Sequence, residues 1–200
     1  MMRVAVIDAG GANIGSVRYA LDRLGVASVL TADADVIVAS ERVILPGVGA
    51  AKVAMARLRE LDLIETIHSL QQPLLGICLG MQLLFDSSEE GEVETLGLLA
   101  GRVTKLPEAT GIRIPHMGWN QLAIRRESPL LAGIESGAAC YFVHSYAAPV
   151  TQDCIASSAH GLPFAAVVQR GNVAGAQFHP ERSGAVGARL LQNFIRSPLP

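Results

Sequence analysis

The sequence predicts an α/β fold: a doubly wound, mostly parallel sheet with flanking helices and an additional β-rich part toward the C-terminus. Three observations indicate this. In the first half, short apolar segments alternate with segments of helical periodicity, which is typical of parallel βαβ units. The second half carries several short runs that favour strands, separated by turn residues. Between them, a turn from strand to helix around Cys78 has the glycine spacing of a nucleophile elbow.

Each expected element follows from local periodicity and turn residues. The helix after residue 13 has Asn13 as a suitable cap and Gly25 at its end. We expect strands at Arg3 to Asp8, Ala27 to Leu30, Arg42 to Leu45, Pro73 to Ile77, Arg102 to Leu106, Gln121 to Ile124, Cys140 to Ser145, Cys154 to Ser158, Phe164 to Arg170 and Asn172 to Gln177. We expect helices at Ile14 to Leu24, along the apolar positions from Val53 to Ile67, after Cys78, and at Ala185 to Ile195. The acidic stretch from Ser87 to Gly97 predicts a solvated surface loop.

Composition narrows the class of protein. The chain has 200 residues, of which half are hydrophobic and 17% are charged, so we expect one domain spanning residues 1–200. A net charge of -2 without a basic run argues against nucleic acid and anionic membranes as partners. The most apolar stretch, from Pro73 to Phe85, is too short to span a bilayer. Three cysteines without a close pair indicate a reducing cytoplasm, with neither a disulfide framework nor a metal site.

Cys78 is the first candidate for catalysis. Gly76 and Gly80 flank it at two residues on either side, so strand and helix can pass closely there. At the start of a helix, free N–H groups and the helix dipole favour a thiolate, which is the nucleophilic form of cysteine. The alternative is that Cys78 is a small buried apolar residue, as isolated cysteines in apolar runs usually are.

His179 and Glu181 complete a candidate triad. They belong to the segment Phe-His-Pro-Glu that follows the last strand, and Pro180 favours an extended conformation at His179. Residues two apart in an extended segment point to the same side, so we expect Glu181 to orient the His179 ring. The alternative is a capping glutamate beside an unrelated surface histidine. Candidate oxyanion donors are the backbone N–H groups of Leu79 and of Val48 or Gly49, in the Pro-Gly-Val-Gly turn after the third strand.

These motifs resemble class I glutamine amidotransferases. The resemblance rests on Gly-Ile-Cys-Leu-Gly-Met-Gln from Gly76 to Gln82 and on Phe-His-Pro-Glu from Phe178 to Glu181. Pro-His-Met-Gly-Trp-Asn from Pro115 to Asn120 and Tyr-Phe-Val-His-Ser-Tyr from Tyr141 to Tyr146 resemble the glutaminase subunits of imidazole glycerol phosphate synthases. The first turn departs from the usual Asp-Tyr-Gly-x-Gly-Asn, with Ala9 and Ala12 in place of tyrosine and glycine.

The resemblance implies the fold of that family, an activity and a partner. Cys78, His179 and Glu181 are then the catalytic residues that hydrolyse glutamine through a thioester, without cofactor or metal. Val48, Gly49, Leu79, Gln82, His144, Ser145 and Tyr146 are then the substrate-binding residues. The implied partner is a (β/α)₈-barrel cyclase that uses the ammonia in histidine biosynthesis and forms a heterodimer with this chain. Our candidate interface residues are Trp119, Asn120, Asn13 and Arg182, although Trp119 and Tyr146 could instead be core residues, and His144 a hydrogen-bonded histidine at a strand end.

Two other interpretations remain open from the residues. The same triad could serve another ammonia-using synthase, such as that of pyridoxal phosphate synthesis, or hydrolyse a different substrate. A flavodoxin-like binding module with an inert Cys78 is the alternative from a different class. Labelling of Cys78 by a glutamine-like electrophile distinguishes an enzyme from a binding module.

Overall fold

The computed structural model describes residues 3–10, 14–108 and 110–197. Within these residues the main feature is an eight-stranded sheet in the order β2-β1-β3-β4-β14-β13-β12-β9. The strands from β2 to β14 in this order pair in parallel, and β13, β12 and β9 pair antiparallel. The bounds are β1 (Val4–Ile7), β2 (Ser28–Thr31), β3 (Arg42–Gly47), β4 (Leu74–Cys78), β9 (Ala123–Ile124), β12 (Cys154–His160), β13 (Leu162–Arg170) and β14 (Val173–Ala176). The predicted α/β class and the change to β structure are confirmed.

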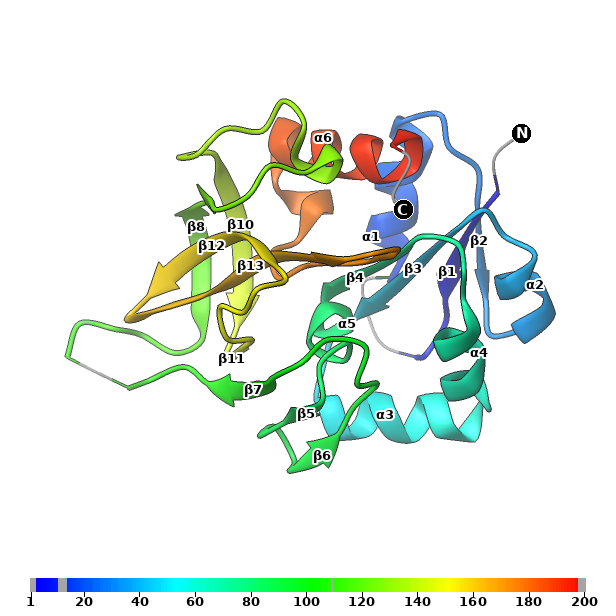
Figure 1. Ribbon diagram of the computed structural model, residues 1–200, viewed down its shortest axis with the longest axis horizontal. Helices are drawn as coiled ribbons and strands as arrows, with labels where there is room; N and C mark the ends of the chain where they lie inside the picture. Colours follow the sequence, from blue (N-terminus) through cyan, green and yellow to red (C-terminus); the bar gives the residue numbers. More distant parts are fainter. Residues whose placement is uncertain (1–2, 11–13, 109, 198–200) are drawn as a thin grey trace.

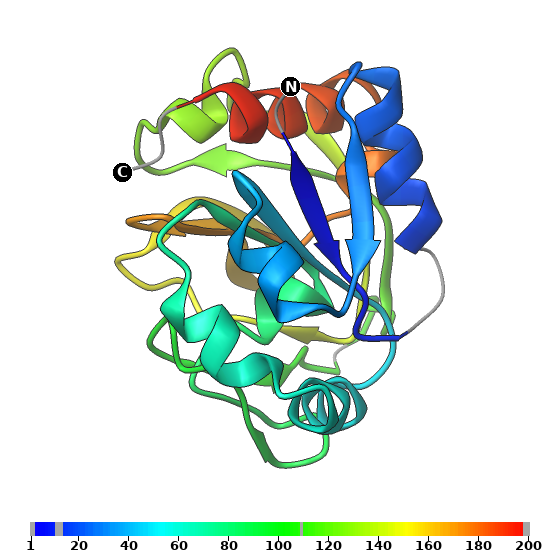
Figure 2. The ribbon, with the colours of Figure 1, turned by 90° about the vertical axis from the view of Figure 1, so that its right-hand side faces the viewer.

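Helices cover both faces of this sheet (Figure 1 and, after a quarter turn, Figure 2). On one face lie α1 (Ile14–Arg23) and α6 (Gly184–Arg196), and on the other α3 (Ala51–Glu60) and α4 (Leu63–Ser69). Alternate residues of β1 explain the two layers, because Val4 and Val6 pack with α1 and α6 whereas Ala5 and Ile7 pack with α3 and α4. An apolar core therefore lies between each face of the sheet and the helices that cover it.

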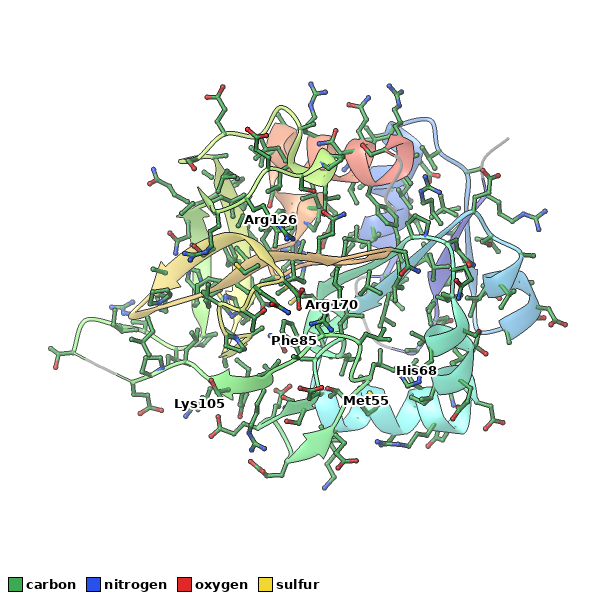
Figure 3. The ribbon with its side chains drawn as sticks, in the orientation of Figure 1. Met55, His68, Phe85, Lys105, Arg126 and Arg170 are labelled. Carbon is green, nitrogen blue, oxygen red and sulfur yellow. The ribbon has the colours of Figure 1, made fainter. Side chains whose placement is uncertain are left out.

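Two smaller sheets lie beside the large one. A ribbon pairs β8 (His116–Gln121) with β10 (Ala139–His144). A second small sheet has the order β11-β7-β5-β6, formed by β11 (Tyr146–Ala147), β7 (Arg102–Lys105), β5 (Ser87–Ser88) and β6 (Val93–Glu94). Phe85 and Arg170 lie between this second sheet and the large one (Figure 3). Arg170, the last residue of β13, forms an ion pair with Asp153, at 2.7 Å, and donates a hydrogen bond to the carbonyl of Leu98, in the segment that joins β6 to β7.

Several local expectations were wrong. The acidic stretch after Asp86 is not a simple solvated loop, because β5 and β6 pair there and Ser88 is fully buried. The helical pattern from Val53 to Ile67 forms two helices, since Asp62 takes a left-handed conformation, with φ 54°, and turns the chain between them. The short helix α2 (Ala34–Val38) was not predicted at all, and the expected strand from Gln121 to Ile124 is divided between β8 and β9. Asn13 and Ala12 lie outside the described residues.

Candidate active site

Cys78 lies at a sharp turn from β4 into the short helix α5 (Leu79–Gln82). Its backbone has φ 53° and ψ -111°, which costs a non-glycine residue about 1–3 kcal/mol. Glycine is required on both sides. A Cβ on Gly76 would lie 2.6 Å from the Gly80 carbonyl oxygen, and a Cβ on Gly80 would overlap the carbonyl oxygen of Leu45. The expected elbow is therefore present, and because α5 is so short its own N–H groups matter more there than a helix dipole.

His179 and Glu181 lie together as expected, but by a different local structure. The Nδ1 atom of His179 donates to Oε1 of Glu181 at 2.9 Å, and the Glu181 side chain is 2% exposed. The extended conformation ends at His179, and the 3₁₀ turn η2 (Pro180–Arg182) carries Glu181 back under the ring. Our expectation of an extended pair was wrong, since Pro180 is well suited to the first position of a helical turn.

The backbone of His179 is fixed by the β8–β10 ribbon. Its N–H donates to the Tyr141 carbonyl at 2.9 Å, and its carbonyl accepts from the Ser183 hydroxyl at 2.7 Å. The same hydroxyl accepts from the Tyr141 N–H at 3.0 Å. These bonds fix the position of the His179 backbone, and so of its imidazole, relative to β10 of the ribbon.

The electrostatics of His179 favour its charged form. Burial alone lowers the pKa of this imidazole, but side-chain hydrogen bonds to Cys78 and Glu181, with the charges of both, outweigh burial and raise it to about 10. Because Nδ1 is bonded to Glu181, Nε2 is the nitrogen left for the sulfur. The arrangement places a proton-carrying imidazole between the Cys78 sulfur and a carboxylate, as acyl transfer through cysteine requires.

A cavity of about 280 Å³ opens beside Cys78. Every residue that we expected to bind substrate lines it, together with Cys78 and His179: Val48, Gly49, Leu79, Gln82, His144, Ser145 and Tyr146. Glu181 is not in this lining and lies behind His179, facing a second cavity beside α1. Pro115, Val143 and Glu90 also line the site and were not expected there. Glu90 was missed because it belongs to the acidic stretch that we interpreted as a surface loop.

Two backbone turns meet at the floor of this cavity. The β3–β4 register pairs Gly47 with Cys78, so Val48 and Leu79 follow side by side at the carboxyl edge of the sheet. A Cβ on Gly47 would lie 2.9 Å from the Gly80 nitrogen, which shows how closely the turns pack. Gly49 has φ 99°, a conformation that suits glycine. The expected oxyanion donors thus come from adjacent strands.

The wall of the cavity is hydrogen-bonded internally. The Gln82 amide donates to the Tyr146 carbonyl at 2.8 Å and to Oε1 of Gln177 at 3.0 Å. The Gln177 amide lies 3.9 Å from the Cys78 sulfur, to which it donates. His144 donates to the same Tyr146 carbonyl at 2.8 Å. Gln82 and His144 therefore shape the wall by holding Tyr146, and His144 is both hydrogen-bonded and part of the lining.

The candidate interface residues differ in exposure. Trp119 is 60% exposed, so the alternative of a core tryptophan is wrong, and it lies on the same face of β8 as Met117, which is 63% exposed. Asn120 points to the opposite face, where its amide donates to the Ala159 carbonyl at 2.9 Å. Arg182 is exposed on η2, and Asn13 is not described.

Of the helices in the described ranges, none combines the length and apolarity needed to cross a membrane.

Comparison with known proteins shows the family to which the chain belongs. The family model described as "Glutamine amidotransferase class-I" matches residues 5–197. The chain belongs to the class I glutamine amidotransferase family. In Xanthomonas axonopodis pv. citri (strain 306), a relative named "Imidazole glycerol phosphate synthase subunit HisH" is 62% identical over 200 residues, 100% of each chain. A relative of the same name in Xylella fastidiosa (strain Temecula1) is 60% identical over 195 residues, 98% of each chain.

Solved structures of this amidotransferase fold resemble the chain over nearly its full length. A crystal structure titled as glutamine amidotransferase has a TM-score of 0.73 at 21% identity and covers 96% of each chain. The structure of PurLQS from Thermotoga maritima has a TM-score of 0.70 at 22% identity, covering 96% of this chain and 97% of that one. At these identities the likeness is one of fold, and it confirms the fold class that the sequence predicts.

Proposed function

We propose that this chain is the glutaminase subunit of an imidazole glycerol phosphate synthase. It hydrolyses glutamine to glutamate and ammonia and passes the ammonia to a cyclase subunit of histidine biosynthesis. The pathway follows from relatives about 60% identical over the whole chain. The observation that best supports the chemistry is the cavity that Cys78 and His179 share, with Glu181 bonded behind the imidazole.

The reaction proceeds in two stages at Cys78. His179 takes the proton of the Cys78 thiol, the sulfur attacks the side-chain amide carbon of glutamine, and the N–H groups of Val48 and Leu79 stabilise the oxyanion. The C–N bond then breaks, His179 gives its proton to the departing nitrogen, and ammonia leaves a thioester on the sulfur. Water attacks the thioester with His179 as base, the C–S bond breaks, and glutamate leaves. Throughout, Glu181 holds the ring by Nδ1, so Nε2 handles the transferred proton.

Glu90 suits the amino-acid end of the substrate. Its carboxylate lines the cavity while one oxygen, Oε2, accepts from the Ala51 N–H at 2.8 Å. A carboxylate anchored in this way can accept from the α-ammonium of glutamine with its other oxygen. We therefore assign Glu90 to substrate binding, beside the residues expected from the sequence.

The exposed ribbon suits a docking partner. Free ammonia becomes ammonium in neutral water and loses its nucleophilic lone pair, so an acceptor enzyme must cover the site. Met117 and Trp119 project from β8, and the cross-strand partner of Met117, Val143, lines the cavity. We propose that the cyclase barrel docks over Trp119 and Arg182, next to the cavity mouth. Cys78, Cys140 and Cys154 are free thiols, and we propose the reducing cytoplasm as their compartment.

A coupled assay tests the function. Ammonia release from glutamine is measured with the chain alone and with the cyclase subunit and its ligand, using Cys78→Ala as the control. We expect slow release alone, strong stimulation by the cyclase, and none with the control. Stimulation by the partner subunit of a different synthase, with none by the cyclase, would contradict the assignment to histidine biosynthesis but not the assignment as a glutaminase.

A further inference from the structure

A chain of hydrogen bonds runs from the outer ribbon to the wall of the cysteine site. The Asn120 amide donates to Nε2 of His116 at 3.2 Å, and Nδ1 of His116 faces Nε2 of His144 at 3.0 Å. Nδ1 of His144 bonds the Tyr146 carbonyl at 2.8 Å. That carbonyl also accepts from Gln82, so both of its lone pairs are used. Nothing in the glutaminase mechanism above requires Asn120 or His116.

The protons along this chain have one consistent arrangement. The Tyr146 carbonyl can only accept, so His144 carries its proton on Nδ1 and leaves Nε2 as an acceptor. His116 must therefore donate from Nδ1 and accept at Nε2. The amide group of Asn120 fits this arrangement, because its nitrogen also donates to the Ala159 carbonyl and its oxygen accepts from the Gln121 N–H at 2.8 Å. If either imidazole carried its proton on the other nitrogen, two donors or two acceptors would face each other within this chain of hydrogen bonds.

Packing keeps both imidazoles neutral and in place. The His116 ring is stacked between the rings of His160, at 4.2 Å, and Phe142, at 5.0 Å. Burial lowers the pKa of His116 to about 4 and that of His144 to about 3. At neutral pH each ring thus has a single N–H, and its position is decided by the neighbour rather than by charge.

We propose that His116 is a positioning residue that fixes the Nδ1–H tautomer of His144 and, through it, the Tyr146 carbonyl and the Gln82 amide at the glutamine pocket. This inference rests on the proposed function for its substrate. The Tyr146 carbonyl and the His116 donor select the same tautomer of His144. Without the donor at residue 116, only the carbonyl still selects Nδ1–H and the buried Nε2 atom loses its partner, so the Nε2–H tautomer, which releases Tyr146, becomes populated. The pocket wall then loses one of the two bonds that orient it, and glutamine binding weakens.

Three variants separate positioning from packing. In His116→Phe a ring still stacks on His160 and Phe142 but offers no donor. In His116→Asn the amide nitrogen takes the place of Nδ1 and offers the donor again. His160→Phe is the matched control, because His160 packs on the same ring and its Nε2 bonds the Arg113 carbonyl, at 2.7 Å, rather than His144. Thermal unfolding checks that all three fold.

The first readout is the ¹⁵N NMR spectrum of His144 in each variant. We expect wild type, His160→Phe and His116→Asn to keep Nδ1–H, and His116→Phe to show a mixture of tautomers. The second is glutaminase kinetics in the complex with the cyclase. In His116→Phe we expect the KM for glutamine to rise about three- to tenfold, the effect of one hydrogen bond, with a smaller change in kcat, and to recover in His116→Asn.

The inference is overturned if His116→Phe retains a pure Nδ1–H tautomer of His144, or if its KM equals that of His160→Phe. Failure of the proposed function has a different signature. A wild-type chain that releases no ammonia with the cyclase would refute the glutaminase assignment, and the tautomer of His144 would then decide by itself whether His116 fixes the ring.

Discussion

The His179 imidazole lies between the Cys78 sulfur and the buried Glu181 carboxylate, and these two neighbours determine its protonation state. Hydrogen bonds and charges from Cys78 and Glu181 raise its pKa to about 10 against the opposing effect of burial. Glu181 acts on the ring from the side away from the cavity. At the scale of single residues, the structure therefore separates the group that reacts from the groups that keep it ready.

Replacing the nucleophile tests this separation. We expect Cys78→Ser to lower glutaminase activity by at least about 10³-fold, because a serine hydroxyl beside His179 is a far weaker nucleophile than a thiolate. The measurement is ammonia release in the complex with the cyclase. The fold should persist, since sulfur and oxygen differ little in size, and near-normal turnover in this variant would contradict the assignment of Cys78.

Removing the orienting charge gives a different result. Glu181→Gln keeps the size of the side chain and removes the carboxylate that holds Nδ1 of His179. We expect the rate to fall by about 10²- to 10⁴-fold and the pKa of His179 to move down. Steady-state kinetics and NMR titration of His179 measure the two effects. An unchanged pKa would show that Glu181 is not the partner that charges the ring.

At the scale of elements, the elbow and the ribbon make different demands on sequence. The elbow needs small residues because α5 passes directly over β3 and β4. The ribbon alternates, with Met117 and Trp119 on its exposed face and His116 and Asn120 on its inner face. One strand, β8, thus carries candidate docking residues outward and the proposed positioning residues inward.

Two helical glycines, Gly80 and Gly15, differ in the space around them. A Cβ on Gly80 would overlap the Leu45 carbonyl oxygen, whereas a Cβ on Gly15 would meet only Tyr19, at 3.8 Å. We expect Gly80→Ala to lower the free energy of unfolding by about 1–3 kcal/mol or more. Gly15→Ala should leave it unchanged or raise it by about 0.5–1 kcal/mol. Urea unfolding measures both, and equal effects would mean that the close approach at Gly80 is relieved elsewhere.

Trp119, on the exposed face of the ribbon, is the proposed anchor for the cyclase. We expect Trp119→Ala to weaken binding of the cyclase by about tenfold or more, as for a central aromatic anchor, and to change stability by less than about 0.5 kcal/mol. Titration calorimetry measures the binding. Val38→Ala is the control, because Val38 is also exposed, at 54%, but precedes β3 at the end of the sheet opposite the site. Equal affinities of the two variants for the cyclase would show that the docking surface does not include Trp119 of β8.

At the scale of the whole molecule, three buried histidines make the free energy of unfolding depend on pH, two of them on the acid side and one on the alkaline side. His116 and His144 have pKa values of about 4 and 3 in the folded protein, below the ordinary 6.5. As pH falls below about 6.5 the unfolded chain takes up protons that the folded chain refuses, so stability falls. His179 behaves in reverse. Its contribution is complete below about 6.5 and is lost as pH rises toward about 10.

The stability that these histidines supply is therefore greatest near neutral pH. We expect His116→Phe to flatten the acid side of the profile and Glu181→Gln to flatten the alkaline side. Each histidine can contribute a slope of up to about 1.4 kcal/mol per pH unit. Urea unfolding at pH values from about 5 to about 9 measures both slopes. Parallel profiles for wild type and His116→Phe would show that His116 is not buried as a neutral ring.

Local patterns in the sequence determined the class of fold and the elbow at Cys78, whereas the expected substrate-binding residues Gln82, His144, Ser145 and Tyr146 came from the family resemblance. Periodicity and glycine spacing are local properties, so they can be read before folding. The motifs around Cys78 and His179 also pointed to the family, which the comparisons confirm.

Only the tertiary structure decided how distant segments meet. The acidic stretch became strands with a carboxylate on the cavity because β5 pairs with β7, a long-range contact that no local pattern contains. Likewise Glu181 reached His179 by a 3₁₀ turn, and His116 met His144 across the ribbon. A hydrogen bond between side chains depends on register and packing, and these exist only once the sheets have formed.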